Sequence, residues 1–119
     1  MILVDTSIWI EHLRVGCPEL SDLLETGEVL VHPFVVGELA CGNLRNRAEV
    51  LSVLGGMPET RVASHQEVLF FVEQKRLMGR GIGYVDAHLL AAAALTPPTR
   101  IWTADRRLAQ AAASMELAH

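Results

Sequence analysis

Ile2-Leu3-Val4-Asp5-Thr6-Ser7-Ile8-Trp9-Ile10 is the stretch that decides the fold. Its first three residues form a short unbroken apolar run, which is typical of a strand buried on both faces in a parallel sheet. The polar residues that follow end this strand, and the apolar spacing beyond them predicts a helix as far as Gly16. Thr6 or Ser7 is expected to cap that helix.

The same alternation of helix and strand continues along the chain. Further helices are expected over residues 18–27, 33–42, 48–54, 64–78 and 84–94 and after Asp105, and further strands over 28–32, 60–62 and 100–103. Strands that alternate with helices predict an α/β fold with right-handed crossovers. We therefore expect one domain over residues 1–119, with a central parallel sheet of four or five short strands flanked by helices.

The composition fits a globular protein that does not enter a membrane. Half of the 119 residues are hydrophobic, which is enough for a continuous core. The longest apolar run, Leu89 to Leu95, is mostly alanine and falls short of the roughly 20 residues that span a bilayer. Because the sequence begins with strand-like residues and no basic segment, we expect no secretory signal and a soluble, cytoplasmic protein. Cys17 and Cys41 lack the spacing of a metal site and are expected to carry no chemistry.

The net charge of −4 argues against a protein that coats nucleic acid by general attraction. Any polyanion must therefore be bound locally. Six arginines are candidates for contacts to phosphate, although solvated surface is the default role for each. They are Arg45, Arg47, Arg76, Arg80, Arg106 and Arg107.

Three of the four aspartates stand at strand ends or helix starts, namely Asp5, Asp86 and Asp105. Helix capping explains each of these positions as well as a function does. However, the carboxyl ends of parallel strands meet at one edge of a sheet, where ligand sites form. Asp5 and Asp105 are therefore expected at the same edge.

Glu38 is a fourth acidic candidate, because the helix at 33–42 is apolar nearly all round and is expected to be buried. A buried carboxylate needs a cation, hydrogen bonds or a proton. No Lys or Arg lies within four residues of Glu38, Asp5 or Asp86. Arginines that are distant in the sequence but close in the fold remain one explanation of how these acids are neutralised.

A divalent cation is the other explanation, because several carboxylates at one edge of a sheet repel one another unless a positive charge neutralises them. Ligands that offer only oxygen favour Mg²⁺ or Mn²⁺ over Zn²⁺. Such ions activate water for in-line attack on a phosphodiester. The acids therefore indicate nuclease chemistry.

Four segments, one around each acid, resemble the acidic motifs of PIN domains, and they occur in the order that the family shows. The closest similarity is to the VapC-type toxins of bacterial and archaeal toxin-antitoxin pairs, and it covers nearly the whole chain. The segments are Val4-Asp5-Thr6-Ser7-Ile8-Trp9-Ile10, Pro33-Phe34-Val35-Val36-Gly37-Glu38-Leu39, Gly83-Tyr84-Val85-Asp86-Ala87-His88-Leu89-Leu90-Ala91-Ala92 and Ile101-Trp102-Thr103-Ala104-Asp105-Arg106.

This resemblance implies an endoribonuclease that cuts structured RNA such as tRNA or rRNA, depends on Mg²⁺ or Mn²⁺, is inhibited by a cognate antitoxin protein and is often a homodimer. Thr103 matches a hydroxyl residue that supports the last acid, and we include it among the catalytic residues. Thr6 or Ser7 is expected to assist near the first acid, although capping is the expected role of Ser7. The residues that match the family's metal-binding and catalytic acids are Asp5, Glu38, Asp86 and Asp105.

Two alternatives come from other functional classes. A receiver-like signalling domain also gathers acids at a sheet edge to hold Mg²⁺, but it needs a lysine at a late strand end, and the only lysine here, Lys75, is expected mid-helix. A binding module that has lost catalysis is the second alternative, and the presence of all four acids argues against it.

The remaining histidines and tryptophans of interest are expected to be structural, although His88 could instead support a residue of the site. His88 follows Asp86 by two positions, so the two side chains point in different directions on a helix. His32 ends a strand and is expected to be hydrogen-bonded there. Trp9 and Trp102 occupy apolar positions and are expected in the core.

Overall fold

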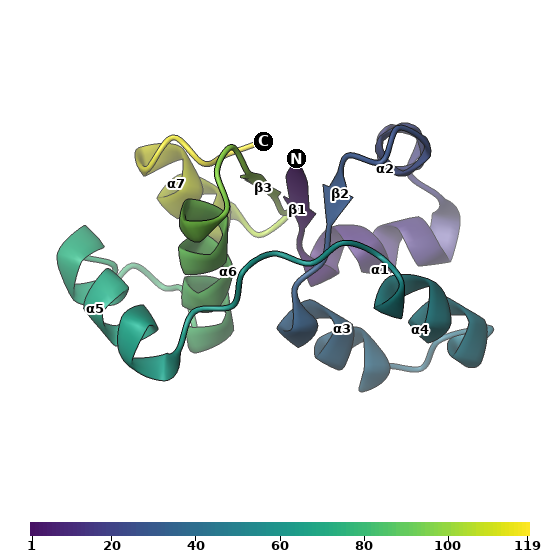
Figure 1. The fold of residues 1–119 in the computed structure, drawn as a ribbon, viewed down its shortest axis with the longest axis horizontal. Helices are drawn as coiled ribbons and strands as arrows, with labels where there is room; N and C mark the ends of the chain where they lie inside the picture. Colours follow the sequence, from purple (N-terminus) through teal and green to yellow (C-terminus); the bar gives the residue numbers. More distant parts are fainter.

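The computed structural model describes residues 1–119 and contains seven helices around a three-stranded parallel sheet (Figure 1). The strands are β1 (Ile2–Val4), β2 (Val29–Leu30) and β3 (Arg100–Trp102). The helices are α1 (Thr6–Val15), α2 (Pro18–Glu25), α3 (Pro33–Ala40), α4 (Arg47–Gly55), α5 (His65–Lys75), α6 (Tyr84–Leu95) and α7 (Arg106–Ser114).

The N-terminal strand lies at the centre of the sheet, in the order β2-β1-β3. Leu3 is paired with Leu30 on one side and with Ile101 on the other. Both Leu3 and Val4 are fully buried, because helices cover both sides of the strand. The expected α/β fold with a buried first strand is therefore confirmed.

The sheet has fewer strands than the four or five expected. No strand forms at 60–62. Instead, Glu59 makes a single bridge to Val31, and the amide of Arg61 donates to the hydroxyl of Thr96 over 3.0 Å, which takes the chain away from the sheet. On the opposite edge, Ala118 makes a single bridge to Ile101. The sheet is thus three strands wide, with one isolated bridge on each edge.

Helices lie on two sides of the sheet. In Figure 1, α5, α6 and α7 lie on the β3 side of the sheet, α1, α2 and α4 extend on the β2 side, and α3 lies below the strands. α6 and α7 pack against β3, and α1 packs against α3. No helix is long and apolar enough to cross a membrane. The shared core includes Leu3, Leu20, Leu39, Leu90, Ile101 and Leu108.

The α3 helix is not buried all round, so this expectation was wrong. Val35 and Leu39, which are four residues apart, face the core. Glu38 lies on the exposed side of the helix, and Phe34 keeps 37% of its surface exposed. A helix that is apolar on most sides gives no sequence signal for which side will face the sheet. Glu38 is therefore an exposed acid and not a buried one.

Candidate active site

Asp5 ends β1 and caps α1. Its backbone amide donates to the carbonyl of Trp102 over 2.9 Å, and its Oδ1 accepts from the amide of Thr6 over 2.8 Å. The expectation that Thr6 or Ser7 caps this helix was wrong, because Asp5 is the residue with extended backbone at the helix start. Only 8% of Asp5 is exposed, so this carboxylate is nearly buried at the end of the central strand.

Thr103 joins the first acid to the last. Its hydroxyl donates to Asp5 Oδ2 over 2.6 Å and accepts from the amide of Asp105 over 3.0 Å. The Ser7 hydroxyl lies 3.2 Å from the same Asp5 oxygen and accepts from the amide of Ala104 over 3.0 Å. These hydroxyls fix the loop after β3 against the end of β1.

Asp105 is exposed and caps α7. Its Oδ1 accepts from the amides of Arg107 and Leu108 over 2.9 and 3.1 Å. A carboxylate at a helix N-terminus also benefits from the helix dipole. The capping explanation of Asp105 therefore holds, and it leaves the Oδ2 atom without a protein donor.

Glu38 approaches the same place from α3. Its Oε1 accepts a hydrogen bond of 2.6 Å from the hydroxyl of Thr6, the residue next to Asp5. Thr6 therefore links α3 to the end of the central strand, and it brings the second acid beside the first.

Asp86 completes the group from the first turn of α6, where its Oδ2 accepts from the amide of Gly83 over 3.1 Å. Burial raises the pKa of Asp86, and the negative charges of Asp5, Asp105 and Glu38 raise it further. The hydrogen bond from Gly83 acts in the opposite direction. Asp86 therefore lies within electrostatic range of the other three acids.

No lysine, arginine or histidine forms an ion pair with any of these four carboxylates. The ion pairs of the molecule are Arg14–Glu11 and His119–Glu19, both elsewhere. The side chain of Arg107 lies against Gly81 instead, where a β-carbon would approach its Cδ to 2.5 Å. Distant arginines therefore do not explain the acids.

The donor chemistry of this acidic cluster (Asp5, Glu38, Asp86 and Asp105) fits a hard divalent cation, since it offers only carboxylate oxygens. As the side chains are placed, no three acidic, histidine or cysteine side chains lie in position to hold an ion together. Mg²⁺ does not require such a cage, because it usually keeps several waters and takes one or two carboxylates. The cluster thus matches a hard divalent cation in charge and ligand type.

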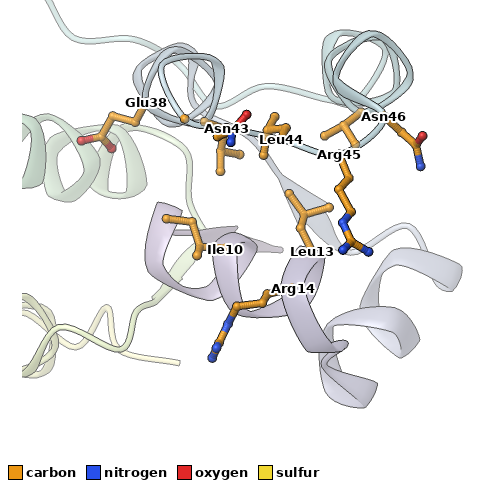
Figure 2. A pocket seen from close by; sticks show the side chains of 11 residues that line it. Ile10, Leu13, Arg14, Glu38, Asn43, Leu44, Arg45 and Asn46 are labelled. Carbon is orange, nitrogen blue, oxygen red and sulfur yellow. The ribbon is translucent and has the colours of Figure 1, made fainter.

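A groove of about 600 Å³ lies beside Glu38, between α1 and the connection from α3 to α4. Figure 2 shows Glu38 at one end of the groove and Arg45 at the other, with Ile10 and Leu13 of α1 between them. Arg45 is exposed and has no ion pair. The groove therefore joins an apolar surface to the acidic cluster.

The expectations for the histidines hold. His32 is fully buried, and its Nδ1 accepts from the amide of Phe34 over 3.0 Å, which caps α3. His88 is buried in α6 beneath the ring of Phe34. Both therefore have structural roles.

Trp9 lies in the core as expected, whereas Trp102 is only half-buried and packs against His119. Cys17 and Cys41 are free. The six candidate arginines are all exposed, which leaves their roles open.

Sequence reasoning passed over two exposed aromatic residues beside the acidic cluster, Phe34 and Tyr84. The spacing of residues in the sequence could have pointed to them. Phe34 precedes Glu38 by four residues, so the two share one face of a helix, and Tyr84 precedes His88 by four residues on the helix that carries Asp86.

A family model for the PIN domain matches residues 2–114 of the chain. The chain belongs to the PIN-domain family. Two curated relatives, each named Ribonuclease VapC32, come from Mycobacterium tuberculosis strains CDC 1551 / Oshkosh and ATCC 25618 / H37Rv. Each is 48% identical over 118 residues, which make up 99% of this chain and 95% of the relative. The resemblance to PIN domains of the VapC type is thus confirmed.

PIN-family membership also removes the receiver-like alternative. Lys75 ends α5 and is exposed, so no lysine stands at a strand end as a receiver would require. Asp5 and Asp105, in contrast, follow the ends of β1 and β3.

Proposed function

We propose that this chain is a metal-dependent endoribonuclease that hydrolyses phosphodiester bonds in tRNA or rRNA, and that it is the toxin of a toxin-antitoxin pair. The observation that carries this proposal is the convergence of four carboxylates from four segments with no cation paired to any of them. The PIN fold and the VapC-named relatives support RNA as the substrate.

Asp5, Glu38, Asp86 and Asp105 are the residues that would hold Mg²⁺ or Mn²⁺. When bound, such ions neutralise the phosphate and make water a stronger nucleophile. A positive charge would stabilise ionised Asp86, because burial and its acidic neighbours raise its pKa. The other acids are oriented by hydrogen bonds from the chain itself.

Thr103 acts as a positioning residue in this proposal. Its hydroxyl holds the Oδ2 atom of Asp5 and the amide of Asp105 at the same time, so both acids keep a fixed orientation. Partners that orient metal ligands in this way typically contribute 10- to 100-fold to affinity or activity.

Cleavage of total tRNA and rRNA by the purified, partner-free protein tests the proposal. We expect cutting with Mg²⁺ or Mn²⁺, none in EDTA, and none from Asp86→Asn. Asp22→Asn is the matched control, because Asp22 lies on α2 outside the acidic cluster. Cutting in EDTA would falsify metal dependence. RNA binding with no cutting under any ion would instead favour the catalytically inactive binding module.

We also propose that the antitoxin occupies the groove beside Glu38. Ile10 and Leu13 expose apolar surface there, and an inhibitor seated in the groove would reach the acidic cluster. Leu13→Asp should weaken inhibition by the partner encoded next to this gene while the free enzyme still cuts RNA. Unchanged inhibition would place the partner elsewhere.

A homodimer and a cytoplasmic location complete the proposal, by analogy with toxins of this type. Light scattering on the purified protein measures the oligomeric state. A monomer at micromolar concentration would contradict the dimer without affecting the nuclease proposal.

A further inference from the structure

Two aromatic side chains stay at the surface of the helices that carry Glu38 and Asp86. Phe34 is 37% exposed and Tyr84 is 46% exposed. Phe34 lies one helical turn before Glu38 on the same face of α3, and Tyr84 opens α6 two residues before Asp86. We call this pair the aromatic shelf. The proposed hydrolysis does not use either ring.

Histidines hold the shelf in place. The buried ring of His88 lies between the two aromatic residues, with its centroid 4.6 Å from that of Phe34 and 4.7 Å from that of Tyr84. The Tyr84 hydroxyl is 2.7 Å from Nδ1 of His65, and His32 packs against Phe34 at 5.0 Å. The two rings are therefore fixed before any ligand arrives.

The chemistry of the shelf suits a nucleobase. Aromatic rings stack on bases that are free of a duplex, whereas paired bases keep their faces covered by neighbouring base pairs. Stacking also needs no positive charge, which matters in a protein with a net charge of −4. A ligand held by stacking would therefore tolerate salt better than one held through phosphates.

We infer that Phe34 and Tyr84 bind an unpaired nucleobase next to the scissile phosphate. This inference rests on the proposed ribonuclease function. Phe34 and Glu38 share one face of α3, so a base stacked on the Phe34 ring sits beside an acid of the cluster. Tyr84 extends this surface on the other side of His88. The shelf thereby selects RNA in which that base is unstacked.

The first experiment measures binding without cleavage. A short single-stranded RNA carries 2-aminopurine next to the bond that the wild-type protein cuts, and the protein carries Asp86→Asn so that the RNA stays intact. Stacking quenches the fluorescence of this base. We expect Phe34→Leu and Tyr84→Leu to lose the quenching and to bind roughly 5- to 100-fold more weakly. A duplex of the same sequence should not compete.

Two further variants separate stacking from folding. Tyr84→Phe keeps the ring and loses only the hydrogen bond to His65, so it should retain most of the binding. Phe70→Leu is the matched control, because Phe70 is 67% exposed on α5 and has no contact with the acidic cluster. Thermal melting of each variant checks that the fold is intact.

The second experiment is a double-mutant cycle that combines a change in the protein, Phe34→Leu, with a change in the RNA, the removal of one base. Removing the base next to the cut bond should weaken binding to the Asp86→Asn protein but hardly affect binding once Phe34→Leu is added. Equal losses in both proteins would overturn the inference. If the wild-type protein cuts no RNA under any ion, the ribonuclease function fails instead. Single-stranded RNAs with 2-aminopurine at each position in turn would then test base stacking on the shelf by itself.

Discussion

Asp86 carries the clearest energetic signature of the acidic cluster at the residue scale. Its raised pKa means that the folded protein binds a proton there more readily than the unfolded chain does. The stability that this group contributes is present at low pH and is lost as the pH rises through the raised pKa. Ionised Asp86 therefore destabilises the metal-free protein at neutral pH.

We predict that Asp86→Asn raises the melting temperature of the protein in EDTA at pH 7, and that the difference shrinks as the pH is lowered. Asparagine keeps an oxygen to accept from Gly83 but removes the charge. Mg²⁺ should stabilise the wild type more than the variant. A variant that melts below the wild type at pH 7 in EDTA contradicts this account.

His32 predicts a separate loss of stability in acid. Burial, with the nearby His88, lowers the pKa of His32 to about 4 from an unfolded value of 6.5. The unfolded chain therefore takes up the proton first, and stability falls as the pH drops below about 6.5. The loss reaches about 2 kcal/mol by pH 5.

Urea unfolding at pH 7 and pH 5 measures this effect. His32→Asn keeps a side-chain acceptor for the amide of Phe34 without the titrating ring, so its stability should change less between the two pH values. The quantity compared between the wild type and His32→Asn is the change in the free energy of unfolding from pH 7 to pH 5, and not its absolute value. Equal changes in both proteins would assign the acid sensitivity to other groups.

At the scale of elements, the β3–α7 connection depends on one hydroxyl. Thr103→Val leaves Asp5 Oδ2 without its shortest donor and the amide of Asp105 without an acceptor. We predict that RNA cleavage falls about 10- to 100-fold and needs more Mg²⁺, while Thr103→Ser restores most of it. Full activity of the valine variant at every Mg²⁺ concentration would show that the hydroxyl does not orient the acids.

The elements also show how far the sequence can predict this fold. The unbroken run at β1 gives a clear signal, because a strand covered on both faces is apolar throughout. Asp5 and Asp105 follow strand ends, so their meeting could be predicted from topology alone. Glu38 and Asp86 come from helices, and their approach to Asp5 depends on how α3 and α6 pack.

Three expectations failed because tertiary contacts decided them. The side of α3 that faces the core is set by Val35 and Leu39, and the sequence offers several equivalent choices. Asp5 caps α1, because the end of β1 positions this residue at the start of the helix. The expected strand at 60–62 does not form, and the amide of Arg61 donates to the hydroxyl of Thr96 and not to a neighbouring strand.

At the scale of the whole molecule, the last residues cover an edge of the sheet. The amide of Ile101 donates to Leu117 over 2.7 Å, and the amide of His119 donates back to Ile101 over 2.9 Å. We predict that removing residues 117–119 lowers the free energy of unfolding by at least about 1–3 kcal/mol, the worth of the two bonds to Ile101 alone. The bared edge should also promote self-association, which light scattering detects. Unchanged urea unfolding would show that the tail adds nothing.

The central position of β1 affects how the protein is made on the ribosome. β1 is synthesised first, yet β3 and Thr103, which holds Asp5, come 98 residues later. Contacts this distant in sequence form late and only after most of the chain is available. A nascent chain interrupted before Arg100 lacks both its closing strand and its last acid. A toxin built in this way would be harmless to the cell that translates it until its synthesis is nearly complete.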